Sequence, residues 1–234
     1  MAANQNSGFS KWAEEQRKKY GNLKNLSIPQ TLNDLWEKAG SYSLAGKDSS
    51  SFQCRLTLER HPTIKSEHLW ERVITQSLQQ ERFYNQFSLI GTNNIDLLQK
   101  NAQGEIFRLF ELKTGSNELS HAAYEIVFYY FLLRRASNLG LLKDSLAPTI
   151  DLIVLAPNDY YKTEPHHNFL TQLQKALLTV KDYGNCHIKF MPLLDLKDRA
   201  ECRSFTKILR KSTTNDRIDP KVEKQIRDYF LSYE

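Results

Sequence analysis

The stretch Ile95–Lys113 reads IDLLQKNAQGEIFRLFELK, and its pattern decides the fold. Two apolar runs, at 95–98 and 106–113, flank a polar segment, which is typical of two strands joined by a turn. Side chains alternate between the two faces of a strand, so we expect Glu111 and Lys113 to point to the same face. The stretch therefore predicts a β-hairpin that carries an acid and an amine side by side near its end.

The charged residues of this hairpin suggest a particular chemistry. Burying an acid and an amine is costly unless they hold one another or a metal ion. The hairpin can bring Asp96, on the neighbouring strand, beside Glu111 and Lys113. Two carboxylates form a hard oxygen site for Mg²⁺ or Mn²⁺, and the lysine can stabilise charge on a phosphate oxygen or orient an attacking water. This set suits hydrolysis of a phosphodiester, whereas an isolated Glu-x-Lys is more often a surface ion pair.

Asp96 followed by Glu111-Leu112-Lys113 resembles the core motif of the PD-(D/E)XK nuclease superfamily, which includes restriction endonucleases, Holliday-junction resolvases and RecB-type nucleases. The resemblance covers well under half of the chain, and Ile95 stands where the name-giving proline would be. It implies an α/β fold with a restriction-endonuclease-like core, a mixed central sheet flanked by helices in the order αβββαβ. It also implies a metal ion held by Asp96, Glu111 and the carbonyl of Leu112. Lys113 would then position or activate the water.

A helix predicted from Glu67 to about Gln80 precedes the hairpin, with Ser66 as its N-cap. Glu67 and Glu71 are four residues apart and therefore share a face of this helix. In the superfamily the corresponding helix often contributes a further acid. The resemblance assigns this role to Glu67 first, as a further metal ligand, and to Glu71 second. The alternative is that both are solvated charges near a favourable helix N-terminus.

A second helix is predicted at about 120–136, and it is apolar nearly all round, which indicates burial on most sides. Glu125 is the only acid in this apolar body and needs a partner, for which Lys113 is the obvious candidate. Glu125 and Tyr129 resemble the Gln-x-x-x-Tyr pattern of RecB-type relatives, with Glu in place of Gln. Glu125 would either orient the lysine or form a structural ion pair, and the structural role is slightly favoured.

The rest of the chain extends the predicted core on both sides. Residues 1–51 are predicted to form a helical and loop extension that caps a nuclease-like domain at 52–234, the two making one compact unit. An alternative for the extension is that basic residues such as Arg17 grip a backbone phosphate. The other predicted elements are an edge strand at 52–59, strands at 83–90, 149–156 and 188–192, helices at 9–20, 32–39 and 168–181, and a C-terminal helix at 220–232 started by Asp219 and Pro220.

The composition narrows the classes of function. A net charge of +5 and a sequence pI ≈ 9.0 favour binding to polyanions without requiring it. No run is long enough to cross a membrane and no signal peptide is recognisable, so we expect a cytoplasmic protein. The cysteines Cys54, Cys186 and Cys202 are widely spaced and predict neither a disulfide framework nor a zinc site. The adjacent His166 and His167 lack a third ligand and indicate a solvated loop.

These patterns together predict a metal-dependent nuclease, namely a Mg²⁺-dependent phosphodiesterase acting as an endonuclease on nucleic acid, with DNA favoured. A homodimer, or a larger defence or repair complex, is compatible with this function, since two such sites could cut both strands of a duplex. A second hypothesis is an inactive module that keeps the nuclease scaffold and binds nucleic acid or a protein. A third is a phosphoesterase or nucleotide-handling enzyme of another class, although no phosphate-binding glycine loop is present.

Overall fold

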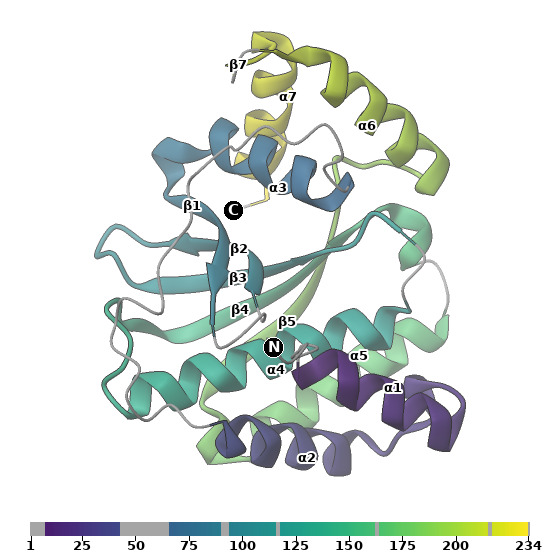
Figure 1. The fold of residues 1–234 in the computed structure, drawn as a ribbon, viewed down its shortest axis with the longest axis vertical. Coiled ribbons are helices and arrows are strands. Elements are labelled where there is room, and N and C mark those ends of the chain that lie inside the picture. Colours follow the sequence, from purple (N-terminus) through teal and green to yellow (C-terminus); the bar gives the residue numbers. More distant parts are fainter. Residues whose placement is uncertain are drawn as a thin grey trace, which may run out of the picture.

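The computed structural model describes residues 8–42, 66–89, 94–115, 118–161, 164–214 and 217–233. These residues form an α/β fold in which a mixed sheet lies between two layers of helices (Figure 1). The predicted strand at 52–59 lies outside the described residues. None of the described helices combines the length and the apolarity that crossing a membrane requires.

Five strands form the central sheet in chain order: β1 (Phe83–Ser88), β2 (Asn94–Lys100), β3 (Ile106–Leu112), β4 (Leu146–Ala156) and β5 (Asn185–Pro192). β1 pairs antiparallel with β2, and β2 pairs antiparallel with β3, which confirms the predicted hairpin. β3, β4 and β5 run parallel, because a helix connects each of them to the next. The sheet is therefore antiparallel on one side and parallel on the other, and β3 is the strand at the change.

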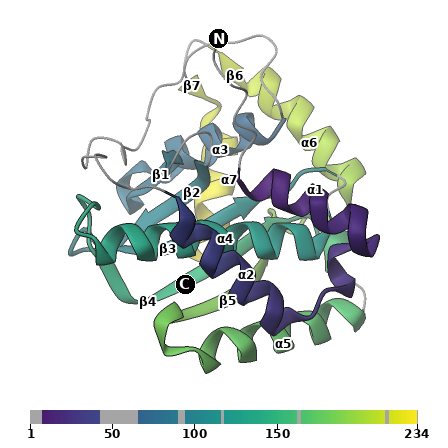
Figure 2. The ribbon, with the colours of Figure 1, turned by 60° about the horizontal axis from the view of Figure 1, so that its bottom comes forward.

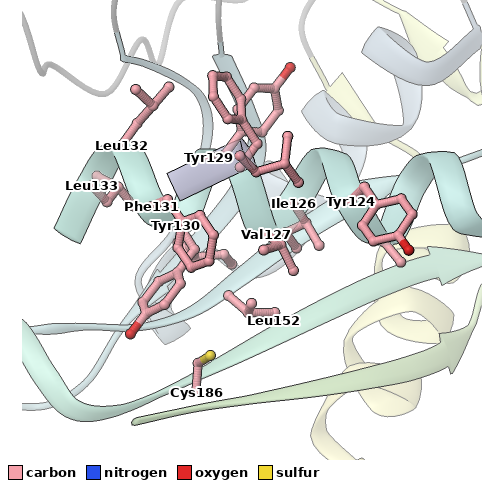
Figure 3. Close-up of a cluster of buried hydrophobic side chains, with 14 of the residues drawn as sticks. Tyr124, Ile126, Val127, Tyr129, Tyr130, Phe131, Leu132, Leu133, Leu152 and Cys186 are labelled. Atoms are coloured by element: carbon pink, nitrogen blue, oxygen red, sulfur yellow. The ribbon is translucent and has the colours of Figure 1, made fainter. Parts of the chain in front are cut away.

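One face of the sheet is covered by α4 (Leu119–Asn138) and α5 (Glu164–Thr179), as Figure 1 shows. The buried side chains of α4 pack against the sheet in a cluster that includes Phe131, Leu152 and Cys186 (Figure 3). The apolar circumference of α4 is explained by its place in the fold, because its outer side is buried as well.

The outer side of α4 is buried by α1 (Gly8–Tyr20) and α2 (Ile28–Ser41), which lie across α4 and α5 (Figure 2). Phe9 and Trp12 of α1 and Leu35 of α2 belong to the same hydrophobic cluster as α4. The N-terminal helices therefore share the main core of the protein.

The opposite face of the sheet is covered by α3 (Ser66–Ser77), α6 (Arg199–Ser212) and α7 (Pro220–Leu231) (Figure 1). The indole of Trp70 donates to Thr206 Oγ1 at 2.9 Å and its ring stacks on Phe205, which joins α3 to α6. The short elements are η1 (Leu23–Asn25), η3 (Gln79–Glu81), η4 (Asn158–Tyr160), η5 (Lys181–Tyr183), β6 (Thr213–Thr214) and β7 (Arg217–Ile218).

Three of the differences from the sequence prediction concern α6, α2 and α5. α6 was not predicted, because its charges mask a narrow buried stripe of Cys202, Thr206 and Leu209. α2 begins before the predicted start at 31, since its second residue, Pro29, is well suited to a first helical turn. The backbone of His166 and His167 lies in the first turn of α5, so the predicted loop at these residues is wrong.

Candidate active site

The candidate site lies where β2 and β3 separate. The last residues paired between them are Leu97 and Phe110, and beyond that pair the backbone N–H of Leu112 donates to Asp96 Oδ2 at 2.8 Å. The next N–H, that of Lys113, turns the other way and donates to the carbonyl of Leu155 in β4 at 2.9 Å. Because the N–H and C=O of one strand residue point to the same side, the carbonyl of Leu112 faces the side on which Asp96 lies.

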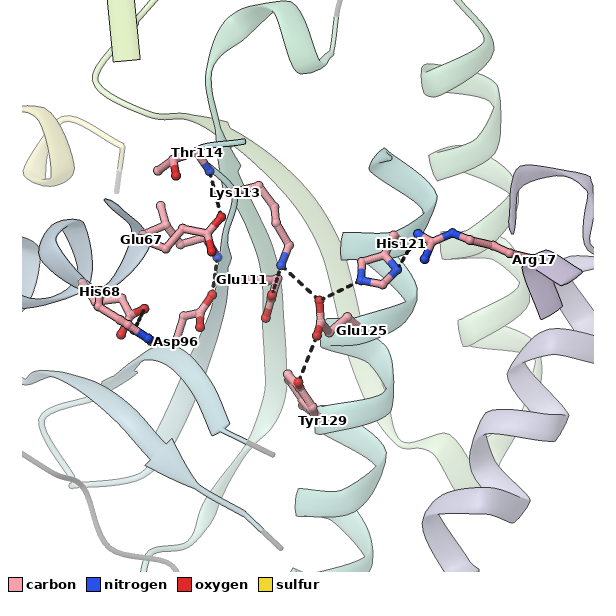
Figure 4. Close-up of polar contacts among 12 residues, drawn as sticks. Arg17, Glu67, His68, Asp96, Glu111, Lys113, Thr114, His121, Glu125 and Tyr129 are labelled. Atoms are coloured by element: carbon pink, nitrogen blue, oxygen red, sulfur yellow. Dashed lines mark hydrogen bonds and ion pairs between the residues drawn. The ribbon is translucent and has the colours of Figure 1, made fainter. Parts of the chain in front are cut away.

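Glu111 and Lys113 lie on the same face of β3, which confirms the prediction from side-chain alternation (Figure 4). Lys113 Nζ lies 2.5 Å from Glu111 Oε1, and both side chains are almost fully buried. The pair is therefore no surface ion pair of the kind that contributes little to a protein. Its charges are held in a region that water does not screen.

Glu125 of α4 is the second partner of the lysine, as the sequence predicted. Lys113 Nζ donates to Glu125 Oε2 at 3.1 Å, and the hydroxyl of Tyr129 donates to Glu125 Oε1 at 3.0 Å. Tyr129 is one helical turn after Glu125, so the Glu-x-x-x-Tyr pattern holds the carboxylate from within its own helix. The lysine thus bridges an acid of β3 and an acid of α4.

The two acids of α3 occupy different places. Glu67 Oε1 accepts from the backbone N–H of Thr114 at 3.3 Å, at the end of β3. Glu71 is deeply buried and accepts from His68 Nδ1 at 3.0 Å and from Gln86 Nε2 at 2.5 Å. Glu67 therefore lies against the backbone beyond Lys113, whereas Glu71 is held on two side chains near the sheet.

His121 and Arg17 also join the site, and neither was singled out for it from the sequence. Arg17 Nη2 lies 2.9 Å from His121 Nδ1, and His121 Nε2 lies 3.5 Å from Glu125 Oε2 (Figure 4). The spacing of four residues between His121 and Glu125 is a signal that could have found the histidine. Nothing in the sequence indicated Arg17, whose contact crosses 104 positions. The contact of Arg17 with His121 uses one of its N–H donors, and the alternative that Arg17 grips a phosphate stays a prediction.

The electrostatics of the cluster are dominated by burial and by repulsion between acids. Burial, reinforced by the charge of Glu71, raises the pKa of Asp96 well above its ordinary value. Burial and the charges of Asp96 and Glu125 do the same to the pKa of Glu111. Burial opposes the charge on Lys113, but Glu111 and Glu125 outweigh it, so the pKa of Lys113 is raised well above its ordinary value. Burial opposes the charge on Glu125 as well, but the charge of Lys113 outweighs it and the pKa of Glu125 is lowered. Lys113 therefore stabilises the ionised Glu125, whereas Asp96 and Glu111 resist ionisation.

The residues present fit a divalent cation held partly by the protein. Glu111 Oε2 is buried and has no hydrogen-bond partner among the described residues, although its other oxygen binds Lys113. Within the same residues, no three His, Cys, Asp or Glu side chains are grouped closely enough to hold a metal ion by themselves. Mg²⁺ commonly takes one or two carboxylates and fills its shell with water and substrate oxygens. Asp96, Glu111 and the carbonyl of Leu112 are donors of that kind.

A groove of about 1400 Å³ is lined mainly by residues of η1, the start of α2 and α5, and the acids and the lysine of the cluster do not line it. Tyr160 lines it, and the charges of Lys113 and Glu111 are close enough to act on the pKa of Tyr160, which burial raises. Ser120, the neighbour of His121, lines the same groove. Its charged lining residues are Lys24, Lys175, Arg199, Glu118 and Asp159.

Comparison with known proteins does not assign the chain to a family. No protein-family model matches it, no curated protein matches it, and no solved structure matches it. Its candidate site must therefore be interpreted from its own residues and geometry.

Proposed function

We propose that the protein is a Mg²⁺- or Mn²⁺-dependent nuclease that hydrolyses phosphodiester bonds in DNA. The observation that carries the proposal is an imbalance of charge. Asp96, Glu111, Glu125 and Glu71 act on one another in a buried region, and Lys113 is the one ammonium group paired with them among the described residues. Such a cluster is costly unless some of its acids take up protons or a cation joins it. The helix, three strands, helix and strand from α3 to β4 are also the order that the PD-(D/E)XK resemblance implies.

In this proposal Asp96, Glu111 and the carbonyl of Leu112 hold the divalent cation, which supplies positive charge to the phosphate under attack. Lys113 is the group of the chain that positions the attacking water or offsets the negative charge that attack builds on a phosphate oxygen. Glu125 keeps Lys113 charged and directed, with Tyr129 fixing the other oxygen of the carboxylate. The role of Glu125 is thus to orient the lysine as well as to pair with it.

The acid contributed by α3 has two candidates. Glu67 lies against the backbone of Thr114, directly after Lys113, and is only partly buried, so it remains accessible to a water or a substrate. Glu71 is more deeply buried, and its charge raises the pKa of Asp96. We assign Glu67 to the completion of the metal shell, and Glu71 to the negative charge around Asp96 that a cation would offset.

The groove lined by Tyr160 offers the nucleic acid a place to lie, and the charges of Lys113 and Glu111 act on the pKa of Tyr160. It carries Lys24, Lys175 and Arg199 beside Glu118 and Asp159, and the whole chain is basic. Action within a strand, rather than at an end, suits a groove that is open. A homodimer would place two such sites on one duplex, as the cleavage of both strands requires.

The proposal is tested with labelled single-stranded DNA, duplex DNA, branched DNA and RNA, each with Mg²⁺, with Mn²⁺ or with EDTA. We expect cleavage of DNA that needs the divalent ion and that disappears in the variant Asp96→Asn. Cleavage that persists in EDTA, or in this variant with its metal dependence unchanged, would contradict the assignment. A mass-spectrometric analysis of the products distinguishes internal cuts from removal of terminal nucleotides.

One observation favours the alternative of an inactive binding module. Lys113 already contacts both Glu111 and Glu125, and the described residues contain no group of three ligands. A module of this kind would bind DNA without cutting it, and calorimetry would detect no binding of Mn²⁺ at millimolar concentration. Binding of Mn²⁺ that is lost in Asp96→Asn would support the nuclease instead.

A further inference from the structure

A continuous line of contacts runs from the N-terminal helix α1 to the lysine of the candidate site. Arg17 contacts His121, His121 faces Glu125, and Glu125 accepts from Lys113 (Figure 4). We propose that Arg17 and His121 are positioning residues, which fix the orientation of Glu125 and, through it, of Lys113. The catalytic part of this inference rests on the proposed nuclease function, whereas its structural part does not.

The first step is the tautomer of His121. A guanidinium group has only N–H donors, so His121 Nδ1, 2.9 Å from Arg17 Nη2, must be the acceptor and carry no proton. The proton of a neutral imidazole then lies on Nε2. Burial lowers the pKa of His121 to about 4, which agrees with a neutral ring at neutral pH. Arg17 thereby decides which nitrogen of His121 presents a proton to Glu125.

The second step is the immobilisation of the histidine ring. The ring of Phe9, also in α1, contacts His121 in an edge-to-face arrangement with a centroid distance of 5.1 Å. The His121 side chain is only 12% exposed. α1 therefore supplies both the hydrogen bond and the packing that hold this ring in one orientation.

The third step is the fixation of Glu125. His121 and Tyr129 stand one turn before and one turn after Glu125 on α4, so they flank its carboxylate from both sides. Tyr129 donates to Oε1 at 3.0 Å, while Oε2 faces His121 Nε2 at 3.5 Å and accepts from Lys113 at 3.1 Å. With donors on both sides, the carboxylate cannot rotate without losing a contact, and the direction of the Lys113 ammonium group is defined. Such outer contacts often change activity by about 10- to 100-fold when they are removed.

Two substitutions of His121 distinguish a role in orienting Glu125 from a role that only attaches α1 to α4 through Arg17. The amide of His121→Asn lies near the place of Nδ1 and can accept from Arg17, but it does not reach Glu125. The longer His121→Gln can place an N–H near the position of Nε2, where it faces Glu125, and gives up the acceptor for Arg17. Positioning predicts that kcat falls by about 10- to 100-fold in His121→Asn with KM little changed, and that His121→Gln recovers most of kcat. The opposite ranking, or equal losses in both, would overturn the proposal.

A measurement that needs no enzymatic activity tests the tautomer directly. In protein with ¹⁵N-labelled histidine, the two ring nitrogens of His121 should show the pattern of an Nε2-protonated neutral imidazole between pH 6 and 8. Arg17→Met should change this pattern, whereas Lys18→Met, on the exposed side of the same helix, should leave it unchanged. A ring that is protonated on Nδ1 in the wild-type protein, or one that is unaffected by Arg17→Met, would contradict the inference. If the protein cuts no nucleic acid, the proposed function fails. The nitrogen pattern still decides whether Arg17 sets the tautomer of His121.

Discussion

Two clusters of charged side chains meet β3, one at Glu111 and the other at Arg108, whose side chains point to opposite faces of the strand. The site cluster consists of Asp96, Glu111, Lys113, Glu125 and Glu71. The Asp151 cluster joins three neighbouring strands, with Asp151 contacted by Lys189 at 2.7 Å, by His187 at 3.6 Å and by Arg108 at 3.8 Å. The first has several acids and one ammonium group, whereas the second has one acid among basic groups.

The difference shows in which cluster the acidic charge is neutralised by other side chains of the protein. Lys189 and His187 are about half exposed, so water screens the Asp151 cluster, and its acid is neutralised by its own neighbours. The site cluster is buried, and burial together with the charges of neighbouring acids raises the pKa values of Asp96 and Glu111. The Asp151 cluster therefore needs no further ion, while the site cluster has an electrostatic reason to bind a cation.

The largest expected difference between the clusters is in catalysis. Glu111→Gln and Lys113→Ala should each lower the rate of metal-dependent cleavage by about 10²- to 10³-fold or more, because the first removes a charged metal ligand and the second removes the positive charge that acts at the phosphate. Asp151→Asn should leave the rate close to that of the wild-type protein. The measurement is kcat/KM on the best DNA substrate, with circular dichroism to verify folding. An equal loss in Asp151→Asn would erase the proposed distinction.

The pH dependence of stability should also separate the clusters. The pKa of His121 is lowered by burial from 6.5 to about 4, so the unfolded chain takes up a proton over this range while the folded protein does not. The stability that this provides is complete above about pH 6.5 and is lost as the pH falls to about 4, by at most about 3 kcal/mol. The difference in unfolding free energy between wild type and His121→Gln should therefore change across this window.

Urea unfolding at a series of pH values measures this difference and cancels the contributions of the other acids. His187→Gln provides the reference for a half-exposed histidine on the Asp151 cluster. A difference between wild type and His121→Gln that stays constant from pH 7 to pH 4 would show that the histidine is not buried as a neutral ring.

Metal binding should stabilise the protein through one cluster only. A ligand present at 100 times its dissociation constant stabilises the folded state by about 2.7 kcal/mol. Mn²⁺ at such a concentration should raise the melting temperature of the wild type and of Asp151→Asn, and should have little effect on Glu111→Gln. Calorimetry measures the heat of Mn²⁺ binding, and EDTA should reverse the rise in melting temperature. A stabilisation that survives in Glu111→Gln would place the ion elsewhere.

The comparison of the two clusters also explains which parts of the fold and of the candidate site could be predicted from the sequence. Alternation along β3 predicted that Glu111 and Lys113 share a face, and the apolar circumference of α4 predicted a buried partner for Lys113 in Glu125. Both are local rules, because strand and helix periods fix the direction of a side chain before any packing is known. The α/β class and the central hairpin followed from the same rules.

The contacts that were missed depend on how distant elements pack. His121 carried a spacing signal toward Glu125, but Arg17 reaches it only because α1 docks on α4 through Phe9 and Trp12. The Asp151 cluster was likewise invisible, since the register of parallel β3, β4 and β5 cannot be derived from each strand alone. Side-chain direction is a property of a segment, whereas these partners are properties of the assembled fold.

The smallest expected effects are changes of stability with opposite signs. Burial and Glu71 raise the pKa of Asp96, so its ionised form destabilises the metal-free fold. Asp96→Asn removes this charge and keeps an oxygen for the N–H of Leu112, and it should raise the unfolding free energy by about 1 kcal/mol at pH 8 in EDTA. Asp151→Asn removes an attractive centre and should lower it by less than about 1 kcal/mol.

Urea denaturation of the two variants at pH 8 and at pH 4 measures this contrast. The gain in Asp96→Asn should fade as the pH falls toward 3.8, the ordinary pKa of an aspartate, because the wild-type carboxyl is then protonated in the folded protein. If both variants lose stability at pH 8, Asp96 is paired as completely as Asp151. The site cluster would then have no excess negative charge to attract a metal ion, and the electrostatic basis of the nuclease proposal would be removed.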